Sequence, residues 1–576
     1  MKAFFSSKIG ILTLFMISIV PVLTFFLYLF VQEYRIESNL GVTPASIVSR
    51  MTLEEKVGQL IHVGINGKSI DSLAVRDIQK FKAGGVILFT ANLGNAEEIQ
   101  DLNRKMQDLS LSSSGIPLFI SIDQEGGRIA RIPEESSPGA MAMGQTGKTE
   151  YAEDVGFLTG YQLRNLGFNL LFAPVLDVNN NPSNPVINTR SFGSSPELVA
   201  EMGLFHARGI RKSLIVPVIK HFPGHGDTDT DSHLALPQIN KSLAELEKVE
   251  LLPFRKSIED GAEALMSAHI LFPELDDTAP ATLSPRILKG ILREKLQYDG
   301  LIFTDAMEMH AISKRYKPED SARKAFLAGA DIILLTSTGP LPEKVFQSLL
   351  SGFQNGELSE DDLNRAVFRQ ISLKYRFGFF NRLSSKYSYE NMNDYFRKRE
   401  DLVEKTYEKI QKKYGDKELY RTVAEDSIRS LKKDYTIRSL DKNDIMFFYS
   451  SRVLKKHALC RDLKDQNVIA LNADLLFKEA TNKESGKTIL VEINESNLAA
   501  WNKFVAKIHA YYKKYPENFP EIIALYNGNP FKKIEVPDKG AVFLSFSPTE
   551  ESMNAMMDVF LEKKVVKKAN LIFSDG

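Results

Sequence analysis

The sequence is poor in cysteine and carries no net charge. Cys460 is the single cysteine among 576 residues, which excludes an intramolecular disulfide framework and a metal cluster held by cysteines alone. The 73 Lys and Arg residues balance 73 Asp and Glu residues, so the chain lacks the excess positive charge of nucleic-acid-binding proteins. Hydrophobic residues make up 43% of the chain, too many for a disordered protein. These figures predict a globular chain of roughly two to four domains, or one large barrel with an accessory domain.

One hydrophobic run stands out at the N-terminus. Residues Ile9 to Val31 carry no charge and are long enough to cross a bilayer of about 30 Å as a helix. The alternative is a cleaved signal peptide, but its hydrophobic region normally has about 7–15 residues and ends at small residues, whereas this run ends in Tyr28 to Val31. Lys2 and Lys8 precede the run, so the positive-inside rule puts the N-terminus in the cytoplasm. We therefore predict that residues 1–38 form a cytoplasmic tip and a transmembrane helix, with the rest of the chain in the periplasm or outside the cell.

Eight short hydrophobic runs follow from residue 50 onward, separated by longer amphipathic segments. This alternation is typical of repeated β-α units around a parallel sheet. Eight such units in roughly 330 residues predict a (β/α)8 barrel of the TIM type over residues 39–380. The predicted strands are Leu60–Ile65, Gly85–Phe89, Pro117–Asp123, Leu170–Asp177, Val216–His221, Ala264–His269, Leu301–Asp305 and Asp331–Leu335. The predicted helices include Ala96–Leu109, Tyr151–Leu166, Leu198–Lys212, Leu243–Glu259 and Asp320–Leu327.

The chain beyond the barrel divides into two parts. Residues 381–420 are dense in charge and tyrosine, which predicts a helical, solvated connector. Over residues 421–576 hydrophobic runs again alternate with helical segments such as Leu498–Tyr511, which predicts a smaller α/β sandwich domain. Its predicted strands are Ile445–Tyr449, Val468–Leu471, Ile489–Ile493, Ile522–Tyr526 and Val542–Phe546.

Five of the predicted barrel strands end in residues that can carry chemistry. These residues are Asp123, Asp177, Lys220 with His221, His269 and Asp305. Any one of them could simply cap a turn or a helix, which is the commonest role of a polar residue at such a place. The active site of a TIM barrel, however, lies at the carboxyl ends of its strands, so all five positions would converge on one mouth.

The loop from Lys220 to His233 is the densest cluster of such residues, with three histidines and three aspartates. A metal site is one interpretation, but Pro223 and two glycines exclude the helical HxxxH arrangement of zinc proteases. Acid–base chemistry is the favoured interpretation. Asp231 and His233 are separated by one residue, so the carboxylate can bond one imidazole nitrogen and leave the other free to exchange protons.

These motifs make the sequence similar to glycoside hydrolase family 3, in its β-N-acetylhexosaminidase branch. The resemblance is carried, in family order, by Asp123-Gln124-Glu125-Gly126-Gly127-Arg128-Ile129-Ala130-Arg131, Phe172-Ala173-Pro174-Val175-Leu176-Asp177-Val178, Arg190-Ser191-Phe192-Gly193, the loop from Lys220 to His233, and Thr304-Asp305-Ala306-Met307-Glu308-Met309. The second domain resembles the family's α/β sandwich through Gly528-Asn529-Pro530-Phe531 and the run Val542 to Pro548.

The resemblance implies a retaining exo-hydrolase that removes terminal β-linked N-acetylglucosamine through a covalent glycosyl-enzyme. It implies that Asp305 is the nucleophile and that Asp231 with His233 supplies the acid and the base. It also implies that six further residues line the sugar subsite, namely Asp123, Arg131, Arg190, Lys220, His221 and Met309. No cofactor and no metal is implied.

The residue chemistry supports two of these roles independently. Retention requires a carboxylate that attacks the anomeric carbon and a second group that first donates and then accepts a proton. An aspartate at a strand end, such as Asp305, is held rigidly enough to attack, and a histidine such as His233 titrates near neutral pH. Asp177 could equally bind sugar or cap its strand, whereas His225 and Asp227 are expected to shape the loop.

The sequence thus predicts a membrane-anchored exo-β-N-acetylglucosaminidase that acts on small saccharides or glycans derived from peptidoglycan. A β-glucosidase or broad exoglycosidase of the same family, or an inactive anchored saccharide-binding protein, are the alternatives. The Lys-His-Phe-Pro-Gly-His-Gly start of the loop occurs widely in the family, whereas its Asp-Ser-His ending favours the amino-sugar branch. The second domain is expected to be a scaffold or a wall-binding surface. No nucleic acid is expected as a partner, and the predicted membrane contact is Ile9 to Val31.

Overall fold

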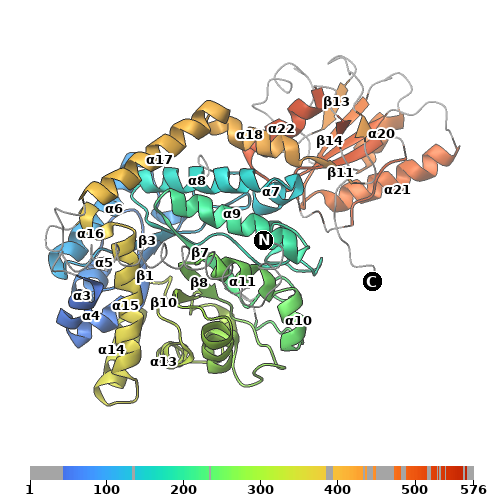
Figure 1. The fold of residues 1–576 in the computed structure, drawn as a ribbon. Coiled ribbons are helices and arrows are strands. Elements are labelled where there is room, and N and C mark those ends of the chain that lie inside the picture. The colour runs from blue at the N-terminus through green and yellow to red at the C-terminus, as the bar shows by residue number, and fades with distance from the viewer. Residues whose placement is uncertain are drawn as a thin grey trace, which may run out of the picture.

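The computed structural model describes the barrel region and much of the second domain (Figure 1). The described residues are 43–132, 136–231, 235–383, 393–431, 435–436, 445–448, 473–481, 488–514, 521–528, 530, 533–538, 540–561 and 565–566. The predicted anchor Ile9 to Val31, the predicted strand Val468–Leu471 and His233 lie outside these residues. Within them, no helix combines the length and the hydrophobicity needed to cross a bilayer.

Eight short parallel strands form the barrel. They are β1 (Ile61–Gly64), β2 (Gly85–Leu88), β3 (Phe119–Ile122), β6 (Leu170–Leu171), β7 (Val216–Phe222), β8 (Ala264–Ser267), β9 (Leu301–Thr304) and β10 (Ile333–Leu334). Each barrel strand from β1 to β9 pairs with the next barrel strand in the chain, except that β9 and β10 meet through a parallel bridge between Phe303 and Ile332. β10 also pairs with β1, so the ring is closed. The prediction of a TIM-type barrel is therefore confirmed.

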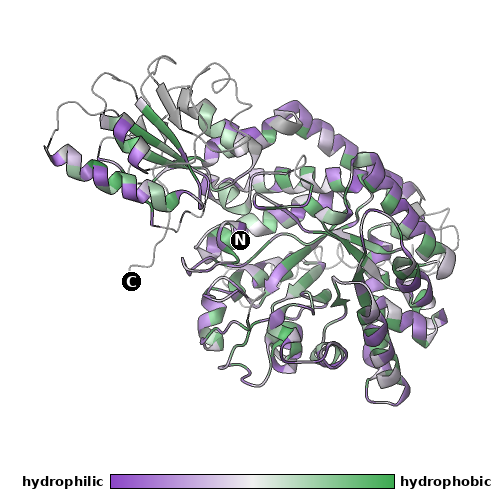
Figure 2. Cartoon of the chain, turned by 180° about the vertical axis from the view of Figure 1, so that it is seen from behind, coloured by the Kyte–Doolittle hydropathy of each residue, from purple (hydrophilic) through white to green (hydrophobic). Residues whose placement is uncertain are grey.

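Amphipathic helices surround the strands. α6 (Ala96–Ser113) begins after Asn95, whose side chain accepts a hydrogen bond from the N–H of Glu98 while Glu98 accepts one from the N–H of Asn95. Three more helices lie within a few residues of their predicted ranges, namely α8 (Thr149–Asn165), α9 (Pro196–Lys212) and α13 (Pro318–Ala328). Figure 2 shows hydrophobic strands at the centre and helices whose hydrophilic residues face outward, as a barrel covered on both faces requires.

The single helix predicted over Leu243–Glu259 is wrong. The structure has two helices there, α10 (Leu243–Lys248) and α11 (Leu251–Glu259). Pro253 has no N–H and is tolerated only in the first turn of a helix. The chain therefore leaves the helical conformation at Val249, which has φ −122° and ψ −78°, and a new helix begins just before the proline.

The strand predicted over Leu170–Asp177 is shorter in the structure, where β6 has two residues. Pro174 cannot donate to a strand ladder, so the ladder stops before it. The chain beyond still runs beside β7, because Val175 forms a parallel bridge with Lys220 and the N–H of Leu176 donates to the Lys220 carbonyl at 2.6 Å. This extended segment brings Asp177 to the carboxyl end of β7.

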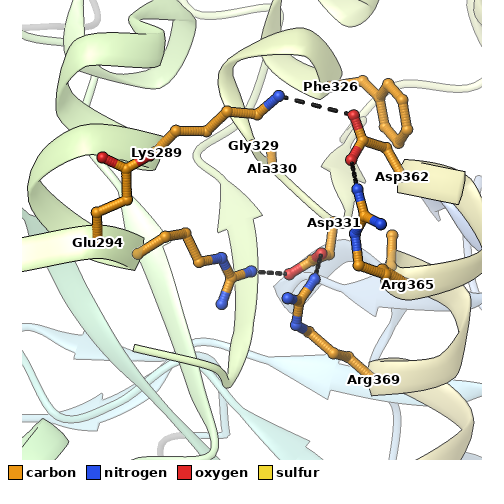
Figure 3. A pocket seen from close by; sticks show the side chains of 11 residues that line it. Lys289, Glu294, Phe326, Gly329, Ala330, Asp331, Asp362, Arg365 and Arg369 are labelled. Atoms are coloured by element: carbon orange, nitrogen blue, oxygen red, sulfur yellow. Dashed lines mark hydrogen bonds and ion pairs between the residues drawn. The ribbon is translucent and has the colours of Figure 1, made fainter. Parts of the chain in front are cut away.

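An ion-pair network holds β10, the last strand of the barrel. Asp331 is buried just before β10 and accepts hydrogen bonds from Arg293 at 2.6 Å and from Arg369 at 3.2 Å. It also accepts from the N–H of Ile302, in β9, at 2.8 Å. The three side chains line a pocket of about 330 Å³ whose other lysine and arginine also pair with a carboxylate (Figure 3). The charges of this pocket are therefore used within the protein, and they fix β10 against β9.

The second domain has a five-stranded sheet in the order β11-β16-β15-β14-β13. β13 (Ile445–Phe448), β14 (Thr488–Ile493), β15 (Ile522–Tyr526) and β16 (Gly540–Leu544) are parallel, and β11 (Arg429–Ser430) runs antiparallel to β16. Around the sheet lie α20 (Ala473–Thr481), α21 (Leu498–Lys514) and α22 (Glu550–Leu561) (Figure 1). Between the barrel and this sheet the described residues form α17 (Asn393–Tyr414) and α18 (Asp416–Ser427), so the predicted connector is helical there.

Lys374, in α15 (Glu360–Arg376), is buried at the amino ends of the barrel strands. Its Nζ atom donates to Oε1 of Gln59 at 2.8 Å and to the carbonyl of Gly84 at 3.0 Å, and it lies over the ring of Phe119 at 4.8 Å. Among the described residues its hydrogen-bond partners are neutral. Burial therefore lowers the pKa of Lys374 to about 7.

We predict that Lys374→Met changes the pH dependence of stability. The pKa of this lysine falls from 10.5 to about 7 on folding, so between these values the unfolded chain binds the extra proton. The wild-type protein therefore loses stability at this site as the pH falls from about 10 to about 7, and a methionine of similar length does not. The difference in melting temperature, Lys374→Met minus wild type, should therefore increase as the pH falls from about 10 to about 7 and stay constant at lower pH.

Thermal unfolding at a series of pH values from about 6 to about 10 checks this prediction. Lys344→Met, at an exposed lysine of α14 (Pro340–Gln354), is the matched control and should differ from wild type by the same amount at every pH. A pH-independent difference for Lys374→Met as well would contradict the prediction.

Candidate active site

The carboxyl ends of the barrel strands carry the polar residues that the sequence predicts there. Asp123 directly follows β3, Lys220 and His221 lie near the end of β7, and Asp305 directly follows β9. His269 lies two residues beyond β8. Because the parallel strands of a barrel end at one rim, these side chains share one mouth.

Lys220 is the centre of a buried charge network. Its Nζ atom donates to Oδ1 of Asp123 at 2.7 Å and lies 2.7 Å from Oε1 of Glu125. Arg190 binds the Glu125 carboxylate with two nitrogens, Nε to Oε2 and Nη2 to Oε1, each at 2.8 Å. Two cations are thus paired with two carboxylates, which is the condition for burying such charges together. We call these four residues the mouth network.

The mouth network keeps its members ionised. Burial by itself would raise the pKa of the Glu125 carboxyl, but the charges of Arg190 and Lys220 outweigh it and hold that pKa far below its usual value. Burial would likewise lower the pKa of the Lys220 ammonium, yet the carboxylates of Asp123 and Glu125 raise it. The network therefore offers fixed charges to a ligand.

Glu125 is a site residue that the sequence reasoning missed, although it stands in a motif that carries the family resemblance. The hydrophobic run of β3 stops at Ile122, so the following residues look like a turn. A signal was present, because Asp123 and Glu125 are separated by one residue and therefore point to the same side of an extended chain. The structure has such a chain there, since residues Gln124–Gly126 form β4.

Asp177 orients His221. Nδ1 of His221 lies 2.6 Å from Oδ2 of the fully buried Asp177, whose Oδ1 accepts from the N–H of His225 at 2.7 Å. An ionised carboxylate only accepts, so Nδ1 carries the proton and Nε2 is the atom that faces Nη2 of Arg190 at 3.4 Å. Burial would raise the pKa of Asp177, but His221 and His225 outweigh it and lower that pKa. The sequence left two roles open for Asp177, binding sugar or capping its strand. Its contacts with His221 and His225 are those of a capping residue that positions its neighbours.

Asp305 begins the loop after β9 and is half-buried. Its Oδ1 atom accepts from the N–H of Ala306 at 2.8 Å. His269 supports the same loop, because its Nε2 donates to the carbonyl of Ala306 at 3.0 Å while its Nδ1 lies 2.9 Å from Oγ1 of Thr282. Burial alone would raise the pKa of the Asp305 carboxyl, but the nearby His269 and His221 side chains hold it below its usual value. Asp305 is thus an ionised carboxylate on a braced loop.

The loop after Asp305 continues to Met309, which was predicted to line the sugar subsite. Met309 is partly buried and directly precedes α12 (His310–Ser313). Glu308 ties this loop to the one after β10, because its Oε1 atom accepts from the N–H groups of Thr336 and Ser337, each at 2.8 Å. The sequence reasoning assigned no role to Glu308.

Arg131 follows a hairpin made by β4 and β5 (Ile129–Ala130). Its Nη2 atom lies 3.8 Å from Oδ2 of Asp123. The buried side chain of Gln124 closes the hairpin, because it accepts from the N–H of Arg131 at 2.7 Å and donates to the carbonyl of Ile132 at 2.9 Å. The hairpin thereby delivers Arg131 to the edge of the mouth network.

The predicted acid/base pair is described only in part. Asp231 is described, and its carbonyl accepts from the N–H of Ala235 at 3.0 Å, whereas His233 lies outside the described residues. In the described part of the chain, no three or more His, Cys, Asp and Glu side chains are grouped as a metal site would require. The role of Asp231 and His233 stays a prediction.

We predict that Glu125→Gln destabilises the fold. The amide keeps the shape of the side chain but leaves the buried charges of Arg190 and Lys220 without their shared carboxylate, which should cost about 3 kcal/mol of the free energy of unfolding. Urea denaturation at neutral pH measures this loss. Glu357→Gln is the control, because Glu357 pairs with Arg323 on the surface and its loss should cost less than about 1 kcal/mol. Equal effects of the two substitutions would show that the mouth network is no more important to stability than a surface pair.

The barrel resembles known glycosidases. A family model described as the glycosyl hydrolase family 3 N-terminal domain matches residues 52–373. Beta-hexosaminidase A of Pseudoalteromonas piscicida is 36% identical over 326 residues, which are 52% of this chain and 54% of that protein. The chain thus spans about half the length of that relative. Beta-hexosaminidase LpqI of Mycobacterium tuberculosis is 31% identical over 343 residues, which are 58% of this chain and 85% of LpqI.

A solved structure extends the likeness beyond the barrel. It is that of a glycoside hydrolase family 3 beta-N-acetylglucosaminidase from Paenibacillus sp. str. FPU-7, with 30% sequence identity and a TM-score of 0.71. The match covers 90% of this chain and 98% of that one, so it includes the second domain. The family model matches more than half of the sequence, and the matched range includes all four residues of the mouth network. The chain belongs to glycosyl hydrolase family 3.

Proposed function

We propose that this protein is a retaining exo-β-N-acetylglucosaminidase. The observation that carries the proposal is the position of Asp305, a half-buried aspartate that directly follows β9 at the rim where Lys220 and His221 lie near the end of β7. The nearby His269 and His221 side chains outweigh burial and hold the pKa of its carboxyl below the usual value. A carboxylate in this setting can attack an anomeric carbon, and the charged groups around it can bind the hydroxyl groups of one sugar. The names of the relatives, beta-hexosaminidase and beta-N-acetylglucosaminidase, support an amino sugar as the substrate.

The proposed sugar subsite combines fixed donors and acceptors. Asp123 accepts hydrogen bonds from a sugar hydroxyl, and Lys220, Arg131 and Arg190 donate them. Such charge-assisted hydrogen bonds are stronger than neutral ones and fix the orientation of the ring. Because the network is already paired before substrate binds, little reorganisation is needed when the sugar enters.

The proposed reaction has two displacements at the anomeric carbon. In the first, an Asp305 oxygen forms a bond to that carbon, the glycosidic bond breaks, and the leaving oxygen takes a proton from His233. In the second, water attacks the same carbon and gives its proton to His233, while the bond to Asp305 breaks. Two inversions restore the β configuration, and every proton is returned. Asp231 orients the imidazole and stabilises its charged form.

Two alternative functions would give a different result in a hydrolysis assay. A β-glucosidase would prefer a substrate without the 2-acetamido group, and an inactive saccharide-binding protein would hydrolyse neither. Chromogenic β-N-acetylglucosaminide and β-glucoside separate these functions from the proposed one. The Asp-Ser-His ending of the loop after β7 supports the amino-sugar choice.

The proposed substrate is a saccharide derived from peptidoglycan, and the proposed site of action is outside the cytoplasm. Both rest on the hydrophobic run Ile9 to Val31 and the lysines before it. Fractionation of cells should find the full-length chain in membranes. Soluble protein with a new N-terminus near residues 32 to 45 would contradict the anchor and indicate that the run is a cleaved signal peptide.

We predict that Asp305→Ala lowers kcat by several orders of magnitude, because it removes the nucleophile. The melting temperature should change little, since the side chain lies at the mouth and not in the packed core. Asp277→Ala, at an exposed aspartate, is the control and should retain full activity. A slow fluorinated N-acetylglucosaminide should leave its sugar on the peptide that contains Asp305. Labelling of another residue, or inversion of the anomeric carbon, would contradict the mechanism.

We predict that His233→Ala lowers kcat/KM strongly for a sugar-linked substrate and weakly for an activated aryl glycoside. A poor leaving group needs the proton from His233, whereas an activated phenolate leaves without it. Asp231→Asn should show a milder form of the same pattern, because it removes the group that orients the imidazole but keeps the imidazole. Equal losses for both substrates would indicate a structural role and move the search for the acid to the second domain.

A further inference from the structure

The second domain and the barrel share one helix. This helix is α7 (Ala140–Thr146), which packs against both domains. Its Met141 and Ala142 belong to the hydrophobic core of the second domain. Its Ala140 and Met143 belong instead to a cluster on the barrel side that includes Phe192. α7 thus contributes side chains to the core of each domain.

The loop after β16 brings a strained residue to this contact. Phe546 has φ +58°, a left-handed conformation that is rare for a bulky residue, and its ring is buried in the same cluster as Met141 and Ala142. Such strain persists only where the surrounding packing enforces it, and it concentrates at functional positions. The unusual turn places the next residue, Ser547, against the barrel.

Ser547 meets two glycines of the barrel domain. Its Oγ atom accepts from the N–H of Gly139 at 3.5 Å. A Cβ on Gly127 would lie 2.8 Å from the Cα of Gly139, so these two backbones meet with no room for a side chain, and it would lie 3.7 Å from the same Oγ, in ordinary contact with Ser547. The N–H of Gly127 also donates to the carbonyl of Ser137 at 2.9 Å, which joins the two glycine segments. The contact is buried, since Ser547 is 1% exposed.

The segment that Ser547 touches carries the sugar-binding residues. Gly127 lies in the turn of the β4–β5 hairpin, whose strand β4 contains Glu125 and whose far end leads to Arg131. α7 in turn packs on the segment that follows Arg190, because a Cβ on Gly144 would overlap the carbonyl of Phe192, two residues after Arg190. Both sides of the Glu125–Arg190 pair are therefore supported by the segment that the second domain contacts.

We propose that Ser547, carried by the second domain, is a positioning residue for the sugar subsite, acting through Gly127 and Gly139 on the hairpin that holds Glu125 and Arg131. This inference rests on the proposed function, because it assigns the hairpin to sugar binding. The second domain is then neither a passive scaffold nor a separate wall-binding surface. It completes the subsite without donating an atom to the reaction.

Ser547→Val in the full-length chain tests the proposal. Valine places one methyl group where the Ser547 Oγ contacts Gly127 and Gly139 and adds a second in this buried position, so it should displace the hairpin and weaken sugar binding in the ground state and the transition state alike. Loss of such uniform binding raises KM and leaves kcat nearly unchanged. We expect KM for an activated aryl β-N-acetylglucosaminide to rise about 10-fold. Ser547→Ala loses the long hydrogen bond from Gly139 but adds no volume, so its KM should stay close to the wild-type value.

The control for Ser547→Val is Ala480→Val. Ala480 is 2% exposed and lies in α20, in the hydrophobic core of the second domain. The added volume should lower the melting temperature there, but KM should stay at the wild-type value. A normal KM for Ser547→Val, or an equal rise of KM in both variants, would overturn the proposal.

The failure of this inference is distinguishable from the failure of the proposed function. A wild-type protein that hydrolyses no N-acetylglucosaminide would refute the function. A wild-type protein that is active, with Ser547→Val behaving as wild type, would refute the positioning role alone. Titration calorimetry with N-acetylglucosamine gives a second readout, in which Ser547→Val should weaken binding about as much as it raises KM.

Discussion

The pairing of Lys220 with Asp123 and Glu125 is the constraint on which the mouth of the barrel depends. Carboxylates around a buried ammonium keep it charged, and a second buried carboxylate then needs a cation of its own, which Arg190 supplies. Meeting this condition requires three chain segments to converge: the residues after β3, the end of β7, and the turn η4 (Asn188–Arg190). Arg131 at the edge of the network and His221 beside Lys220 are brought to the mouth by the same segments.

The two ends of the barrel are stabilised by different means. At the carboxyl end, charges are paired but partly reachable, and Asp305 and Arg131 border them. At the amino end, Asp331 ties the last strand to helical arginines, and Lys374 is buried among neutral partners. An enzyme of this architecture can vary its mouth while the opposite end keeps the ring closed, because the two sets of contacts share no residue.

The described residues of the second domain meet the segments behind the mouth through packing. Helix α7 is shared between the two hydrophobic cores, and the strained Phe546 turn fits Ser547 to a pair of glycines. Two adjacent glycines, Gly126 and Gly127, stand at the hairpin turn because both have positive φ and lie against the backbone of residues 137–139.

Local pattern in the sequence determined the eight barrel strands, most helices and the position of Asp305 at a strand end, because strand and helix periodicity and the end of a hydrophobic run depend on neighbouring residues alone. The tertiary structure decided what depends on distant partners. Glu125 became a site residue only because β7 and η4 bring two cations to it, and Asp177 became a positioning group because an extended segment beyond Pro174 lies against β7. Ser547 meets Gly139 across 408 positions of chain. No periodicity encodes such a meeting, since it is fixed by how two separately formed cores pack on one helix.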